Sequence, residues 1–367
     1  MLSLIIEDLG ISHAQAGLLM SITMLPCIFL VIPLSLFLPG IGIKRAGIAS
    51  IVLTLVGAIV FLLARNFIGL LLGRMIMGLG TVALPLVATQ AVALWFYGHR
   101  IGLAMGIYSA TFLFSNIVTL NTFGIAGLAW GWRSTLLIII AINLIVLIIY
   151  ARFFKKPPEE KSIQGEHAAI SIKSVVHLGR PIWIMASGWA LFQAGNMSFA
   201  TFLPDFIYRQ GIDLQVAGSM TSILMLCTLL LSAPLGLLLD RLHHKEMLIM
   251  AGAVCSCIVS ILLPLYPGLV MLFIVALGIS FTPFAATTFA MVPSLVPRHL
   301  LPLGFGIIAT LSYAGMFSGP SLIGLMRDLT GSYTHSFWLI ALFFSVIIVL
   351  MAFFGRSMKK AGNSSTD

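Results

Sequence analysis

The sequence is poor in charge. Aspartate, glutamate, lysine and arginine together make up 8% of its 367 residues, whereas 60% of the residues are hydrophobic. A soluble domain carries about 25% charged residues. This chain has too few charged residues to cover the water-exposed surface of a soluble protein of its length. The formal net charge of +9 does not indicate nucleic-acid binding either, because the basic residues are scattered in small groups between apolar segments.

The chemistry of several enzyme classes is also missing from the sequence. All four cysteines lie inside apolar runs, which is typical of small core residues and not of disulfide or metal partners. No G-x-x-x-x-G-K-[ST] loop occurs, which argues against ATP-driven transport within this chain. No Ser/His/Asp or paired-carboxylate arrangement lies at a plausible reactive depth. We therefore expect no enzymatic activity, no cofactor and no metal.

Long apolar runs recur from one end of the chain to the other. Each is about 20 residues long, enough for a helix to cross the hydrocarbon core of a bilayer. A β-barrel would instead show short segments of alternating hydrophobicity. The sequence therefore predicts an all-α polytopic membrane protein with eleven helices. The expected spans are 17–38, 46–64, 68–95, 101–125, 134–154, 181–207, 215–239, 247–266, 268–295, 303–326 and 336–355.

The chain contains an internal repeat. Gly10 and the residues after it match Gly211 and the residues after it without a gap, at an offset of 201 (211 − 10 = 201). A second block pairs Gly80 with Gly278 at an offset of 198 (278 − 80 = 198). One helical unit is therefore used twice.

A polar stretch headed by Pro157-Pro158 separates the two copies, because two prolines end the preceding helix. We expect an N-terminal bundle over 1–154, a cytoplasmic linker over 155–179, a C-terminal six-helix bundle over 180–356 and a cytoplasmic tail over 357–367. Shifting the span 181–207 back by 201 places its counterpart mostly before Met1. The first copy is therefore expected to lack its first helix, apart from a tail, and to hold helices 2–6 of a six-plus-six arrangement.

The basic residues favour one orientation. With the linker in the cytoplasm, most of the 20 lysines and arginines fall on the inside, as the positive-inside rule requires. The prediction is a multi-pass protein of the cytoplasmic membrane, with both termini of the intact protein in the cytoplasm. The arginines on the outside are then Arg65, Arg133, Arg209 and Arg327.

Several motifs resemble the major facilitator superfamily of secondary transporters. The most specific is Gly236-x-x-x-Asp240-Arg241-x-x-x-Lys245, which is similar to the signature loop after the second helix of each half. Arg74-x-x-x-Gly78-x-Gly80 resembles the fourth-helix motif of that family. The turn Gly131-Trp132-Arg133 and the pair Gly319-Pro320 resemble its sixth-helix turn and its eleventh helix.

The resemblance implies two pseudo-symmetric six-helix bundles that rock about a central site near the membrane midplane. The expected function is secondary transport of a small organic solute or anion by alternating access. Two alternatives stay open: drug/proton efflux, and a non-transporting sensor or truncated pseudo-transporter. The expected partners are a small-molecule substrate, with a proton or other ion as an optional coupled species, and the lipid bilayer. No nucleic acid is expected, and the chain is expected to act as a monomer.

Arg74 is the one basic residue placed inside a predicted span. A charge in hydrocarbon costs at least about 2.5–3.5 kcal/mol, so the side chain is expected to face the bundle interior or water. Gly78 lies one turn away and would let another helix or a substrate approach. Arg74 is therefore a candidate for binding an anionic substrate or for proton coupling. The alternative is a structural arginine that reaches the interface.

Polar stripes mark two further helices. Trp189, Gln193 and Asn196 share one face of span 181–207, because they recur at helical spacing. Each buried amide needs a partner, either a bound solute or a neighbouring helix. We expect these stripes to line the substrate cavity, with interhelical hydrogen bonds as the alternative. Ser109, Asn116 and Thr119 form a similar stripe on span 101–125, and Tyr313 of span 303–326 is the remaining cavity candidate.

The family motifs supply a second group of candidates. Gly236, Asp240, Arg241 and Lys245 are expected to form a cytoplasmic gate, in which Asp240 links helices by charge. Helix packing is assigned to Gly78, Gly80, Gly319 and Pro320. Asp205 lies near the outer end of its span, and we expect it to be a carboxylate of the outer surface, with proton coupling as the less favoured alternative.

Overall fold

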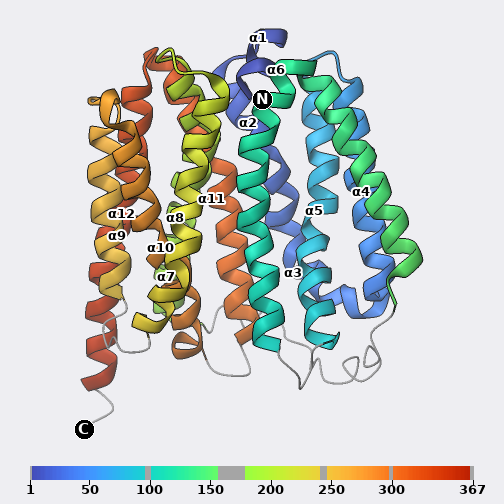
Figure 1. Ribbon diagram of the computed structural model, residues 1–367. Helices are drawn as coiled ribbons and strands as arrows, with labels where there is room; N and C mark the ends of the chain where they lie inside the picture. The colour runs from blue at the N-terminus through green and yellow to red at the C-terminus, as the bar shows by residue number, and fades with distance from the viewer. Residues whose placement is uncertain (1, 96–100, 156–177, 240–245, 297–300, 364–367) are drawn as a thin grey trace. The chain divides into compact units, whose positions relative to one another are not determined.

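A computed structural model describes residues 2–95, 101–155, 178–239, 246–296 and 301–363. All regular elements in these ranges are helices, as the sequence predicts. The chain divides into two compact units, Met1–Ile170 and Ser171–Asp367, and the long helices within each run side by side (Figure 1). We call these units the N-terminal half and the C-terminal half.

In its described residues, the N-terminal half contains six α-helices and one 3₁₀ turn. α4 packs against α5 and α6, and α3 packs against α5. In the C-terminal half, α9 packs against α10 and α12 and α8 packs against α10. The same pairing of corresponding helices in both halves is the structural counterpart of the sequence repeat. The N-terminal elements are α1 (Leu2–Leu9), α2 (His13–Ser21), η1 (Ile22–Met24), α3 (Leu25–Ile41), α4 (Ile43–Leu63), α5 (Phe67–Trp95) and α6 (Ile101–Phe153).

The described part of the C-terminal half likewise contains six α-helices and one 3₁₀ turn. α7 lies at its centre and packs against α11, α12, α8 and α10. Its elements are α7 (Arg180–Tyr208), α8 (Leu214–Leu239), α9 (Glu246–Leu262), η4 (Pro267–Leu269), α10 (Val270–Leu295), α11 (Leu301–Thr330) and α12 (Tyr333–Asn363).

Two expected helix boundaries differ from the structure. The first expected span is interrupted by η1, because Pro26 has no N–H to donate to Ile22, and Leu25 donates to that carbonyl instead. The loop expected between the spans 101–125 and 134–154 is reduced to the single residue Gly131. Its φ of 76° lets two helices meet at a sharp bend within α6.

Within the described ranges, eight helices are long and apolar enough to cross a membrane. Some of these helices expose most of their surface. In residues 125–153 of α6, only 6% of the most apolar 18-residue stretch is buried, as is typical of a helix that faces lipid. α7 is of the opposite type and is not among the eight. Many of its residues are buried among other helices, and it carries amide and hydroxyl groups that lower its hydropathy. A helix surrounded by protein can carry such groups because its neighbours supply hydrogen-bond partners.

Candidate functional site

Arg74 lies in α5 with its side chain turned toward α2 and α4. Its Nη2 atom is 3.5 Å from the sulfur of Met20, and its guanidinium carbon is 5.2 Å from the ring centroid of Phe61. Its Nε atom is buried and donates no hydrogen bond. Among the side chains that the structure describes, no carboxylate lies within 4.0 Å of the guanidinium. Arg74 is thus a half-buried cation whose described neighbours are a thioether and an aromatic face.

Two glycines that follow Arg74 let α5 approach η1 and α4 closely. A Cβ atom on Gly78 would lie 2.5 Å from the carbonyl oxygen of Thr23 in η1. On Gly80 it would overlap the hydroxyl of Thr54 in α4. Both expected packing glycines therefore lie where two helix backbones come too close for a side chain.

The stripe expected on α6 is only partly described. Thr119 is exposed in the N-terminal half. The side chains of Ser109 and Asn116 lie outside the part of the chain that the structure describes. Their assignment to the substrate cavity therefore stays a prediction.

The α7 stripe faces α11 at Gln193. Its Nε2 atom donates a hydrogen bond to the buried hydroxyl of Ser312 at 3.3 Å. A hydroxyl on a neighbouring helix therefore accepts one hydrogen bond from this amide, which favours the interhelical alternative. Asn196 and Tyr313 are half-buried on the same two helices, and their role in the cavity stays a prediction.

Small residues explain why α7 and α11 come so close together. A Cβ atom on Gly315 or Gly319 would overlap the carbonyl oxygen of Ala190 or Ala194, respectively. Gly315 and Gly319 form the small-xxx-small pattern that brings membrane helices into backbone contact. Pro320 lies within α11 without ending the helix.

Trp189 belongs to an aromatic cluster in the C-terminal half. Its ring stacks on Phe192 with a centroid distance of 5.1 Å and meets Phe289 of α10 edge-on at 5.4 Å. The side chain is 7% exposed. Because such offset and edge-on contacts stabilise a core, the structure gives Trp189 a packing role, and its role in substrate binding stays a prediction.

The expected cytoplasmic gate falls almost wholly outside the described residues. Gly236 lies near the end of α8, whereas Asp240, Arg241 and Lys245 are not described. Their function in gating therefore stays a prediction.

The expectation that Asp205 is a surface carboxylate is wrong. Asp205 is 2% exposed and lies inside the C-terminal half. Its Oδ2 atom accepts hydrogen bonds from the hydroxyl of Tyr333 and, at 2.8 Å, from Nε of Arg209. The i, i+4 spacing of Asp205 and Arg209 is a sequence signal for this ion pair. Tyr333, which buries the carboxylate, is 128 residues away and could not be found from local sequence.

A second carboxylate is held in the N-terminal half. Oδ2 of Asp8 accepts hydrogen bonds from the indole nitrogen of Trp132 at 2.9 Å and from Nη1 of Arg133 at 2.8 Å. The pKa of Asp8 lies below its ordinary value, mainly because of the hydrogen bond from Trp132 and to a lesser extent because of the one from Arg133. Trp132 also packs edge-on against Phe61, the residue beneath Arg74.

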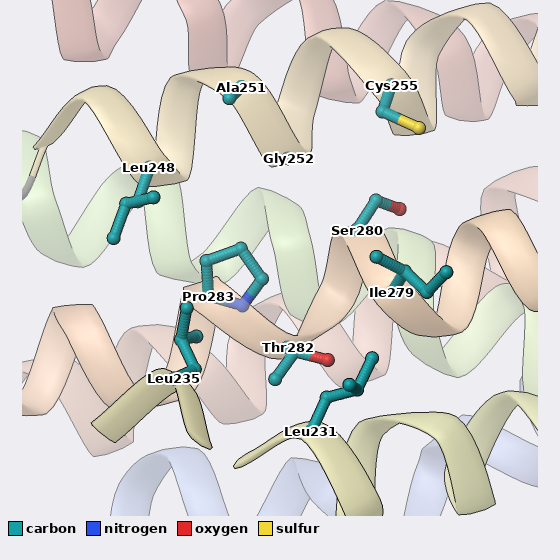
Figure 2. Close-up of a pocket in the computed structure, with 10 residues that line it drawn as sticks. All are labelled: Leu231, Leu235, Leu248, Ala251, Gly252, Cys255, Ile279, Ser280, Thr282 and Pro283. Carbon is teal, nitrogen blue, oxygen red and sulfur yellow. The ribbon is translucent and has the colours of Figure 1, made fainter. Parts of the chain in front are cut away.

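The C-terminal half has an apolar crevice of about 440 Å³ between α8, α9 and α10 (Figure 2). Leucines of α8 and α9 line it, together with Cys255, Ile279 and Pro283. None of its ten lining residues is charged. The crevice therefore suits an apolar chain and not an ionic solute.

The chain was compared with known protein families and proteins. The model of the Major Facilitator Superfamily matches residues 1–220 and 192–366. The "Uncharacterized transporter YybO" of Bacillus subtilis is 23% identical over 90% of this chain and 83% of the relative. The "Probable sulfoacetate transporter SauU" of Cupriavidus necator is 24% identical over 91% and 83%. The "Lysosomal dipeptide transporter MFSD1" of Bos taurus is 20% identical over 85% and 71%.

Solved structures of similar fold are also transporters. A bacterial homologue of the human lysosomal transporter Spinster, in an inward-facing and unoccupied conformation, matches with a TM-score of 0.83 at 16% identity, covering 97% of this chain and 92% of that one. A mutant of the nucleoside transporter NupG matches with a TM-score of 0.81 at 15% identity, covering 96% and 94%. At these identities the likeness shows the fold alone.

Proposed function

Because the chain belongs to the Major Facilitator Superfamily, we propose that it is a secondary transporter that moves a small organic anion across the cytoplasmic membrane by alternating access. The observation that carries the proposal is Arg74. This cation lies in a membrane-spanning helix, and no described carboxylate is close enough to neutralise it.

The electrostatics of Arg74 favour an anionic solute. A charge removed from water without a partner costs several kcal/mol. A carboxylate or sulfonate that binds the guanidinium would supply the missing countercharge and could accept two parallel hydrogen bonds. Thus the desolvation that destabilises the empty protein would strengthen the interaction with the bound anion.

The names of two relatives support a solute with an acidic group. Sulfoacetate carries a sulfonate and a carboxylate, and a dipeptide is a zwitterion with a terminal carboxylate. The relatives named for these solutes are 24% and 20% identical to this chain. We infer that an acidic group of the solute is the part that Arg74 recognises.

The proposal includes an orientation. Most basic residues flank the linker side of the spans, which supports a cytoplasmic linker and a cytoplasmic C-terminal tail. The proposal also includes a monomeric protein, with a proton or other ion as an optional coupled species.

The test is uptake of labelled sulfoacetate and of a labelled dipeptide into proteoliposomes that contain the full chain. We expect saturable uptake of at least one of them. Arg74→Gln should lower the kcat/KM of uptake about 30-fold. This factor is equivalent to a loss of about 2 kcal/mol of interaction free energy between the arginine and the anion. Arg65→Gln is the matched control, because Arg65 is an exposed arginine of the same half.

Three results would contradict the proposal. Undiminished uptake by Arg74→Gln would remove Arg74 from anion recognition. Extrusion of a lipophilic cationic dye that collapses with a protonophore would favour drug/proton efflux instead. Binding of the solutes without any flux would favour the sensor or pseudo-transporter.

A further inference from the structure

Two helices of the C-terminal half meet at one carboxylate, and a third helix contacts the tyrosine that binds this carboxylate. Asp205 of α7 accepts hydrogen bonds from Tyr333 of α12 and from its own helix neighbour Arg209. The guanidinium carbon of Arg327 in α11 lies 4.9 Å from the ring centroid of Tyr333. We call Asp205, Arg209, Arg327 and Tyr333 the α7–α12 brace. One acidic group and one aromatic ring thus join the ends of three helices.

The N-terminal half contains a matching arrangement, the α1–α6 brace, formed by Asp8, Trp132 and Arg133. Its carboxylate also accepts bonds from an aromatic side chain and from an arginine. Here the guanidinium carbon of Arg133 lies 4.2 Å from the ring of Trp132. A carboxylate, an aromatic donor and a stacked arginine therefore recur in both halves.

The two braces occupy equivalent places in the repeat. Trp132 and Tyr333 are separated by the repeat offset (333 − 132 = 201). Each aromatic residue closely follows a glycine of positive φ, Gly131 at 76° and Gly331 at 67°. The carboxylates do not share this offset, since 205 − 8 = 197. The arrangement is therefore preserved in space although its acidic members are not aligned in sequence.

The backbone of α7 explains why a brace is needed there. Pro204 lies inside the helix immediately before Asp205. Proline has no N–H to donate, so one hydrogen bond of the helical ladder is missing at this point. The last turn, Asp205–Tyr208, is thus less firmly joined to the rest of α7, and the bond to Tyr333 attaches it to α12.

We propose that each brace holds the first and last helices of its own half together, α1 to α6 and α7 to α12, so that each pair moves as one body. The α7–α12 brace is the stronger. The Asp205 side chain is 3% exposed, whereas the Asp8 side chain is 42% exposed and its ion pair is screened by solvent. A buried hydrogen bond to a charged group contributes more than an exposed one.

Amide hydrogen exchange of the full chain in lipid nanodiscs tests this inference without any transported solute. We expect Tyr333→Phe to raise the exchange rates of Phe206–Arg209 about tenfold, because loss of a charged hydrogen bond favours local opening. The first half of α7, Ile182–Ala190, should keep its protection. Tyr266→Phe is the matched control, because Tyr266 is an exposed tyrosine of the same half.

A pair of identical substitutions tests the difference between the two braces. Asp205→Asn should raise exchange at the end of α7, and Asp8→Asn should raise exchange in α1 by a smaller factor. In the double variant Asp205→Asn/Tyr333→Phe, the effect on exchange should be smaller than the product of the single effects.

Unchanged exchange at Phe206–Arg209 in Tyr333→Phe would overturn the inference, as would single effects that multiply independently in the double variant. Tyr333→Phe removes only a hydroxyl, so the test remains decisive if Asp205→Asn does not fold. Neither result depends on whether the proposed anion is transported, so this inference and the proposed function can fail separately.

Discussion

Gly278 takes in the C-terminal half the place that Gly78 takes in the N-terminal half. A Cβ atom on Gly78 would lie 2.5 Å from the carbonyl oxygen of Thr23 and 3.1 Å from Pro26. On Gly278 it would lie 2.9 Å from the carbonyl oxygen of Leu224 and 2.6 Å from the Cβ atom of Cys227. The partners correspond at the repeat offset, since 224 − 23 and 227 − 26 both equal 201. The same backbone contact has thus been kept in both halves.

This relationship predicts equal costs for equal substitutions. Gly78→Ala and Gly278→Ala should each destabilise the protein by about 1–3 kcal/mol, because the methyl group would push two backbones apart. Thermal unfolding in detergent should show a lower melting temperature for both variants. Gly268→Ala is the control, since nothing lies within 4 Å of a Cβ atom there. Wild-type melting of either test variant would contradict the assignment.

Arg74→Met should stabilise the solute-free protein while abolishing uptake. Arg74 is half-buried and has no carboxylate partner among the described residues. Replacing it with an apolar side chain removes its desolvation cost, a gain of about 1–4 kcal/mol when buried ion pairs are replaced in this way. The melting temperature without solute should therefore rise. The added anion should raise the melting temperature of the wild type but not that of the variant. A less stable Arg74→Met protein would indicate a structural role for the arginine.

Gln193 and Ser312 provide a test of cavity lining against helix packing. Their hydrogen bond of 3.3 Å joins α7 to α11. If its main role is structural, Gln193→Ala and Ser312→Ala should each destabilise the protein by about 1 kcal/mol and show coupling in a double-mutant cycle. KM for the transported solute should stay within about twofold. A large rise in KM for Gln193→Ala alone would place the amide in the substrate site.

Asp8 predicts a limited pH dependence. Its folded-state pKa lies below the ordinary value of 3.8 because of Trp132 and Arg133. A depressed carboxyl pKa contributes stability that is complete above the unfolded pKa and is lost as the pH falls through the folded pKa. The difference in melting temperature between wild type and Asp8→Asn should therefore be constant from about pH 7 to pH 5 and should shrink below about pH 4. A difference that changes near neutral pH would contradict this cause.

The sequence determined the class of fold because the bilayer is a demanding solvent. Every backbone polar group in hydrocarbon needs a hydrogen-bond partner within the protein, and a helix supplies these partners within a single segment. Apolar runs of sufficient length therefore specify helices, and the repeat offset specifies that the helices form two similar units. The packing role of Gly78 and Gly319 could also be expected, because only small residues allow backbones to touch in lipid.

Contacts between distant segments determined which residues correspond in the two halves and which polar groups are buried. The offset of 198 pairs Gly80 with Gly278, but the contacts pair Gly78 with Gly278, since the place of a residue in a repeat is set by its neighbours in space. Asp205 was expected at the surface and is buried, because Tyr333 and Arg209 supply the donors that make its burial possible. Local sequence specifies which segments enter the membrane, whereas only tertiary structure specifies which polar group will meet a partner there.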